Sequence, residues 1–241
     1  MGTLAIDIET ASPDEEPPSG EYDTTSYFEL VAVALGFRSD TDSRPESDVL
    51  FRDGGWDRTH TAKLLDRLVD WVSQRDVETV LTYNGTGFDF VHLRNWATAT
   101  DENGLTSGVL DSVEELDAKQ VDLKRPAIEH HGNLIKSGHD FPKFERVCDA
   151  RSVPTTDTKY ADYDVDSDFL QQLDGAETVQ GWHIGKYLGE WYVDGAAAGI
   201  TDTRTHQELK TMLSDYARAD VRPLFDLYDS FDAPKQHQSS S

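Results

Sequence analysis

LAIDIET, residues 4–10, is an apolar stretch that carries two acids two positions apart. Alternate side chains of a β-strand point to opposite faces, so Asp7 and Glu9 project from one face and the leucine and isoleucines from the other. The pattern predicts a buried strand over Thr3–Glu9. Two carboxylates at that separation require a cation or raised pKa values, unless they lie on a solvated sheet face.

The rest of the chain alternates strand and helix patterns. We expect strands over 28–37 (FELVAVALGF), near 49–51 and over 78–83, and helices over 61–74, 88–97, 182–193 and 205–229. This order is typical of an α/β layer fold. Thr205 and Glu208 have the spacing of a capping box, which predicts where the last helix begins.

Length and composition indicate one domain over residues 1–229 and a disordered polar tail over 230–241. The single cysteine, and the absence of a signal-peptide pattern and of a long apolar run, lead us to expect a soluble cytoplasmic protein without a membrane partner. The formal net charge is −24, with aspartate abundant and lysine scarce, as in proteins of salt-loving organisms. Molar salt shortens the Debye length to about 3 Å, so this charge does not exclude a polyanionic substrate.

Two further motifs accompany the acid pair. NGTGFD, residues 84–89, follows a predicted strand and leads into a helix, with Asp89 in the first turn, where it could also be a plain N-cap. Tyr216 and Asp220 lie four residues apart in the last helix, so they share one face. Alternatively, they are a buried tyrosine beside an exposed acid. Because Asp7, Glu9 and Asp89 fall at carboxyl ends of strands, we expect them to lie together.

The ordered set D-x-E, N-x3-F-D and Y-x3-D resembles the three motifs of the DEDD superfamily of 3′–5′ exonucleases. Tyr216 stands four residues before Asp220, and Asp215 stands where the histidine branch has its histidine, so the resemblance is to the tyrosine (DEDDy) branch. This branch includes the exonuclease domain of family B DNA polymerases. The resemblance spans Asp7 to Asp220 and implies a stand-alone enzyme, of haloarchaeal origin given the acidity. It also implies a ribonuclease H-like three-layer fold, with a mixed five-stranded sheet and helices on both faces.

The resemblance further implies hydrolysis of single-stranded 3′ ends by a two-metal-ion mechanism with Mg²⁺ or Mn²⁺. Asp7 would bridge both ions, Glu9 and Asp220 would hold the ion that activates water, and Asp89 would steady the second. Tyr216 would orient the attacking water. DNA is favoured over RNA, and DNA repair is one pathway that fits. The predicted nucleic-acid contacts are Thr10, Asn84 and Phe88.

Several alternatives stay open or are rejected. A structure-specific endonuclease of the same fold and a non-catalytic nucleic-acid-binding scaffold are the competing functions. An EF-hand beginning at Asp162 is rejected, because Ser167 and Leu173 replace the required glycine and glutamate. We interpret residues 149–181 instead as a solvated insertion and residues 11–26 as a mobile loop that could gate the site. Zinc binding by His130, His131, His139 and Cys148 is disfavoured by their spacing. Candidate phosphate contacts, each expected to be an ordinary surface residue, are Arg94, Arg125, Lys143, Lys186 and Arg218.

Overall fold

A mixed five-stranded sheet lies at the centre of the computed structural model, which describes residues 1–41, 43–164, 173 and 175–232. Its strands are β1 (Gly2–Ala11), β2 (Glu29–Arg38), β3 (Glu46–Phe51), β4 (Val77–Thr82) and β5 (Gln120–Asp122). They lie in the order β3-β2-β1-β4-β5. The pairs β1–β2 and β2–β3 are antiparallel, whereas β1–β4 and β4–β5 are parallel. The sheet is therefore mixed, as predicted.

β1 is the middle strand, and most of its residues on both faces are buried. Leu4, Ile6 and Ile8 pack into one buried cluster, and Ala5 packs into another on the opposite face. A register shift of the β1–β2 pairing follows Glu9, where the strand leaves the regular ladder. Such bulges redirect side chains and are frequent beside active sites.

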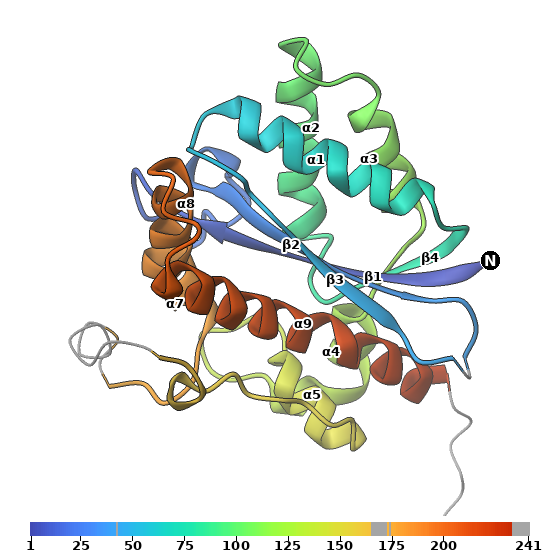
Figure 1. The fold of residues 1–241 in the computed structure, drawn as a ribbon. Helices are drawn as coiled ribbons and strands as arrows, with labels where there is room; N and C mark the ends of the chain where they lie inside the picture. The colour runs from blue at the N-terminus through green and yellow to red at the C-terminus, as the bar shows by residue number, and fades with distance from the viewer. Residues whose placement is uncertain (42, 165–172, 174, 233–241) are drawn as a thin grey trace, which may run out of the picture.

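Helices cover both faces of the sheet and complete three layers. Figure 1 shows α1, α2 and α3 on one side and α4, α5 and α9 on the other. The first group is α1 (Arg58–Ser73), α2 (Asp89–Glu102) and α3 (Val109–Ala118). The second group is α4 (Lys124–His131), α5 (Phe144–Arg151) and α9 (Arg204–Asp232). The expected ribonuclease H-like three-layer α/β fold is confirmed.

A further helical segment closes the end of the sheet where β1 finishes. It runs from α7 (Gly181–His183) through a π-helical stretch, η4 (Ile184–Leu188), into α8 (Gly189–Ala197). A β-carbon on Gly189 would lie 3.0 Å from Cβ of Ala11, so a glycine permits this close approach to β1. Short 3₁₀ turns complete the described elements: η1 (Thr25–Tyr27), η2 (Gly132–Leu134) and η3 (Tyr160–Asp162).

The last helix begins within one residue of the predicted start, but its capping threonine differs from the predicted one by two positions. α9 begins at Arg204, and the Oγ1 atom of Thr203 accepts a hydrogen bond from the backbone N–H of His206 at 3.4 Å. Thr203 therefore occupies the capping position that we assigned to Thr205. The helix also continues to Asp232, beyond the expected end of the domain; residues 233–241 of the predicted tail lie outside the described residues.

The description of residues 149–181 as a solvated insertion is wrong in part. α5 extends into this segment, and Tyr160 and Val179 are buried in the cluster beneath η4 and α8. An isolated bridge pairs Lys159 with Thr178, so two described parts of the segment pair with each other. Asp166, Ser167 and Asp168, which figured in the rejected calcium loop, lie outside the described residues.

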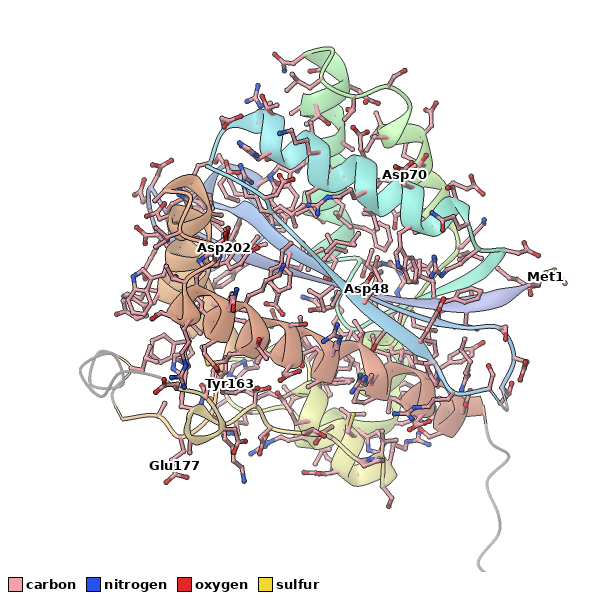
Figure 2. The ribbon with its side chains drawn as sticks, viewed as in Figure 1. Met1, Asp48, Asp70, Tyr163, Glu177 and Asp202 are labelled. Carbon is pink, nitrogen blue, oxygen red and sulfur yellow. The ribbon has the colours of Figure 1, made fainter. Side chains whose placement is uncertain are left out.

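The acidic residues are distributed over the molecule, as expected from their spread along the chain. In Figure 2, Asp48 on β3, Asp70 on α1, Glu177 before α7 and Asp202 before α9 lie on well separated elements. None of the described helices combines the length and the apolar character needed to cross a membrane.

Candidate active site

β1 supplies two acids to the face of the sheet that α9 covers. Asp7 lies opposite Ala34 of β2, and Glu9 lies opposite Ala32. Both alanines are buried, and Ala34 packs in the same cluster as residues of α9. Because these neighbours carry only a methyl group, the carboxylates have room beneath the helix. The predicted placement of both acids on one face of β1 is confirmed.

α9 brings Tyr216 and Asp220 to the same point from the far end of the chain. One carboxylate oxygen from each of Asp7, Glu9 and Asp220 lies within 4.8 Å of the others. The Tyr216 hydroxyl lies beside the Asp220 carboxyl group, as the spacing of four residues allows. Tyr216 and Asp220 therefore act as one unit that faces β1, which is the arrangement that the sequence predicts.

Asp89 reaches this group from α2. It is the first residue of that helix, and its Oδ1 atom accepts a hydrogen bond from the backbone N–H of Ile8 at 3.1 Å. Phe88, not Asp89, is the N-cap residue, so the alternative that Asp89 is a plain N-cap is wrong. One oxygen of Asp89 is thus used to hold the strand, which leaves the other available to a ligand.

The turn before α2 is fixed by Asp122, a residue that the sequence analysis did not single out. Its carboxylate accepts hydrogen bonds from the backbone N–H groups of Asn84 at 2.8 Å and Thr86 at 3.2 Å. Asn84 has a φ of 75°, which asparagine tolerates better than most residues. The Oδ1 atom of Asn84 also accepts a hydrogen bond from Lys124 at 2.6 Å. Asp122 is the last residue of a very short strand, so its sequence context gave no signal of this role.

Burial and mutual repulsion make the carboxylates hard to ionise together. Burial raises the pKa of Asp7 and of Glu9 well above ordinary values, and the neighbouring acids raise them further. Burial raises the pKa of Asp89 to about 7, although its hydrogen bonds with backbone N–H groups oppose the shift. Burial followed by repulsion from Glu145 raises the pKa of Asp220 to about 7. The cluster is therefore under electrostatic strain that a bound cation would relieve.

The residues fit a divalent cation. The Oε1 atom of Glu9 is buried and has no hydrogen-bond partner among the described residues, which is costly for a carboxylate oxygen. It lies in the cluster of three acids whose oxygens converge. Oxygen-only sites of this kind suit Mg²⁺ or Mn²⁺. A cation bound here would satisfy that oxygen and neutralise the repulsion.

A cavity of about 550 Å³ opens over the four acids and Tyr216. The predicted nucleic-acid contacts Thr10, Asn84 and Phe88 all line it. Phe88 is braced by Phe28 and His92, whose ring centroids lie 5.4 Å and 4.4 Å away. The cavity is also lined by residues that the sequence analysis left out or treated as ordinary: Glu16, Tyr22, Trp182 and Lys186.

The disfavoured zinc site gains no support from the structure. Cys148 is buried in the cluster beneath α9, whereas His139 is exposed. His130 and His131 lie against the ring of Phe231 instead. Within the described residues, Asp7, Glu9 and Asp220 form the group suited to a metal ion.

The other candidate phosphate contacts lie away from this cavity or are otherwise engaged. Arg94 pairs with Asp117 at 3.1 Å, and Arg94 and Arg125 line a separate hollow beside α3. Lys143 lines a second cavity of about 460 Å³ that is also lined by Tyr216 and Asp220. Arg218 lines a further hollow beside Asp215. Of the five cations, Lys186 is the one that lines the cavity over all four acids.

The fold and the acid cluster together define a three-layer α/β protein of the ribonuclease H-like type with a carboxylate site at the end of its central strand. No model of a known protein family matches the chain, and no curated protein matches it. Among solved structures, the family B DNA polymerase from the hyperthermophilic archaeon Pyrobaculum calidifontis is similar, with a TM-score of 0.55 and 19% identity. The match covers 95% of this chain and 24% of the polymerase chain, so this chain spans about a quarter of that protein.

Exonuclease I structures are more distant. One matches with a TM-score of 0.38 and 14% identity over 64% of this chain and 36% of that chain. E. coli exonuclease I in complex with a 5cy-dT13 oligonucleotide matches with a TM-score of 0.34 and 14% identity, over 87% of this chain and 42% of that chain. At these identities the polymerase match supports the fold.

Proposed function

We propose that this protein is a metal-dependent 3′–5′ exonuclease that hydrolyses phosphodiester bonds at single-stranded nucleic-acid ends. The observation that carries the proposal is the convergence of Asp7, Glu9 and Asp220, with the buried Oε1 atom of Glu9 lacking a partner. The three motifs are spread over most of the chain, and their acids and Tyr216 line one cavity, Asp89 included. A structural role alone does not account for so many buried, mutually repelling acids.

Asp7, Glu9 and Asp220 would hold one cation, and Asp7 with Asp89 would hold a second. When bound, such ions neutralise charge on the phosphate and lower the pKa of a bound water. Asp89 contributes in a second way, because its hydrogen bond to Ile8 fixes the end of β1 relative to α2.

Tyr216 would orient the attacking water rather than accept its proton. Burial, followed by the negative charge of Asp220, raises the pKa of the Tyr216 phenol above the ordinary value of about 10. The hydroxyl therefore keeps its proton at neutral pH. The phenol lies beside Asp220, and its oxygen can accept a hydrogen bond from a water molecule.

The finer assignments belong to the same proposal. The Y-x3-D spacing favours the tyrosine branch of the superfamily, and the net charge of −24 favours a salt-loving, haloarchaeal source. The single cysteine fits a cytoplasmic enzyme. DNA is the favoured substrate, and DNA repair is one pathway that fits it. At molar salt the surface charge is screened, so positive charge is needed mainly at the scissile phosphate.

The test is cleavage of 5′-labelled single strands of DNA and RNA in molar KCl with Mn²⁺. A ladder of products that shorten by one nucleotide supports the exonuclease. Discrete internal cuts would indicate the endonuclease alternative, and binding without products would indicate a scaffold. Asp7→Ala serves as the matched control, because a contaminating nuclease would survive that substitution. Comparing the two strands also decides between DNA and RNA.

A further inference from the structure

An exposed indole lies at the edge of the candidate active site, and the carboxylate chemistry does not use it. Trp182 is 47% exposed, and Tyr22, at 55%, is the other exposed aromatic residue of this size among the described residues. Both line the cavity that contains the acids. Large aromatic side chains are usually buried, so two exposed ones in a single cavity indicate a surface for a planar ligand.

Trp182 lies beside the reacting groups. A β-carbon on the preceding Gly181 would lie 3.6 Å from the Tyr216 hydroxyl oxygen. Trp182 also lines the second cavity of about 460 Å³, and the two cavities share Tyr216 and Asp220. The indole thus lies between two hollows that meet at the carboxylate cluster. The indole therefore lines both hollows, next to the residues of the carboxylate cluster that they share.

The indole is held in a defined orientation. Its Nε1–H donates a hydrogen bond to the Oε1 atom of Gln180 at 3.1 Å. The rings of His183 and Tyr187 lie at centroid distances of 4.0 Å and 6.4 Å, both inclined by 66°. His183 is itself buried and is fixed by a 2.8 Å hydrogen bond with the hydroxyl of Tyr160. The indole would therefore lose little conformational freedom when a base stacks on it.

Lys186 places a positive charge near the indole. It follows Trp182 by four residues in the continuous helical segment, and both line the same cavity. Its ammonium pairs with Glu16 at 2.6 Å, and both side chains are substantially exposed, at 43% and 61%. Exposed ion pairs contribute at most about 1 kcal/mol, so a phosphate can displace the carboxylate.

Glu16 is brought to Lys186 by the segment after β1. The backbone N–H of Ser12 donates to the carbonyl of Gly185 at 2.9 Å, which attaches the start of this segment to η4. Pro17 lines the cavity beside Glu16. An acid of the protein thus occupies the position beside Lys186 that an anionic substrate group would take.

We propose that Trp182 and Lys186 form a nucleotide subsite for an unpaired strand, which deepens and rests on the proposed nuclease function. The indole stacks on a base next to the scissile phosphate, and the Lys186 ammonium binds a backbone phosphate in place of Glu16. Stacking of this kind requires a base whose face is free, so the subsite selects single-stranded ends over duplexes.

The first experiment compares wild type, Trp182→Ala and Trp182→Phe on an oligothymidylate. Alanine raises KM by roughly tenfold, because each base stacked on an aromatic ring contributes about 1–3 kcal/mol. Phenylalanine keeps KM close to that of wild type, and kcat changes less than KM in both variants. When the oligothymidylate carries an abasic nucleotide at the cleaved end, wild type and the two variants should have the same KM. A KM of Trp182→Ala within about twofold of wild type would overturn the subsite.

The second experiment removes the charge of Lys186 or of Glu16, and the two changes should shift KM in opposite directions. Lys186→Gln raises KM and lowers the slope of log KM against log salt by about one, whereas Glu16→Gln lowers KM. In the Lys186→Gln background, Glu16→Gln has no further effect, because the two residues act as a pair. Glu15→Gln and Lys136→Gln are the controls, since they make the same charge changes outside the cavity and leave KM unchanged. A shift of KM in the same direction for both charge variants would contradict the proposal.

Binding separates this inference from the proposed function. Oligothymidylate quenches tryptophan emission of the Asp7→Ala protein, and Trp182→Phe in the same background removes that quenching. If Asp7→Ala still cleaves the strand, the nuclease assignment fails whatever Trp182 does. If Asp7→Ala is inactive but emission is unchanged by oligothymidylate, the subsite fails alone.

Discussion

The Oδ1 atom of Asp89 accepts the backbone N–H of Ile8 at 3.1 Å, and this bond ties α2 to the strand that carries Asp7 and Glu9. Ile8 lies between the two acids, so its position sets theirs. The carboxylate of Asp89 therefore has a structural task as well as a charge. A substitution that keeps the hydrogen bond but removes the charge, compared with one that removes both, distinguishes the structural task from the effect of the charge.

We expect Asp89→Asn and Asp89→Ala to lose activity equally but to differ in stability. Asparagine keeps an oxygen for Ile8 and removes a buried charge, so the free energy of unfolding at pH 8 rises, by up to about 4 kcal/mol from the shift of the pKa to about 7. Alanine leaves the N–H of Ile8 without a partner, at a cost of about 1–3 kcal/mol. Denaturant unfolding of the metal-free proteins measures both, and equal stabilities would show that the bond contributes nothing.

The metal-free protein should lose stability as the pH rises from about 4 to 7 through these acids. Asp89 and Asp220 have pKa values of about 7 in the folded state, against an ordinary value near 4, so the native state binds more protons in that interval. The stability that the two acids contribute is fully present below their pKa in the unfolded chain. It is lost as the pH rises through their pKa in the folded protein. The measurement is the melting temperature against pH without metal, with Asp89→Asn as the control, which should show a shallower decline.

Added Mn²⁺ should reverse this trend, because the ion binds the ionised carboxylates. The rise in melting temperature caused by Mn²⁺ should be larger at pH 8 than at pH 5. Asp220→Asn should abolish most of the rise. An equal rise at both pH values, or an undiminished one in the variant, would place the ion somewhere other than at Glu9 and Asp220.

Asp7→Ala and Asp220→Ala should each abolish turnover while leaving melting in high salt almost unchanged or slightly higher. Loss of a ligand removes several kcal/mol of transition-state stabilisation, which corresponds to a fall in kcat on the order of 10³-fold. Removing one of several crowded carboxylates relieves repulsion instead of costing stability. Initial rates on labelled strands test the first point, and undiminished cleavage by either variant would contradict the assignment.

The sequence predicted the site better than it predicted its surroundings. Strand and helix periodicity paired Asp7 with Glu9 and Tyr216 with Asp220, because it fixes which side chains share a face. The resemblance of the three ordered motifs to those of known exonucleases added Asp89 and led us to expect all five residues in one site. Asp122 could not be found in this way, since its hydrogen bonds to Asn84 and Thr86 join residues more than thirty positions apart. Periodicity says nothing about such contacts.

The elements around β5 were missed for a related reason. β5 is only Gln120–Asp122, and its place at the edge of the sheet depends on pairing with β4 rather than on an apolar pattern. Trp182 and Lys186 stand four residues apart, and this spacing is visible in the sequence. Which way that face points, however, follows only from how η4 packs against the end of β1.

Tyr216→Phe should slow the reaction less than the loss of a carboxylate does. The phenol keeps its proton because its pKa is raised, so the variant loses a hydrogen bond to water and not a base. We expect kcat to fall roughly tenfold, below the 10²–10⁴-fold typical of general acid–base groups. The shape of the pH–rate profile should be the same in both proteins. A profile that loses one limb in the variant would make Tyr216 a proton acceptor.

The last prediction separates two neighbouring threonines at the start of α9, the helix that carries Tyr216 and Asp220. Thr203 caps this helix through the N–H of His206, whereas Thr205 lies within its first turn. Thr203→Ala should therefore lower the free energy of unfolding by about 1 kcal/mol, and Thr205→Ala by much less. Both changes are exposed and remove the same atoms, so each controls for the other. Since α9 stays anchored by Leu213, Ala217 and Leu224 in the core, kcat should be unchanged in both variants. A larger loss of stability for Thr205→Ala in urea unfolding would restore the capping box that the sequence suggested.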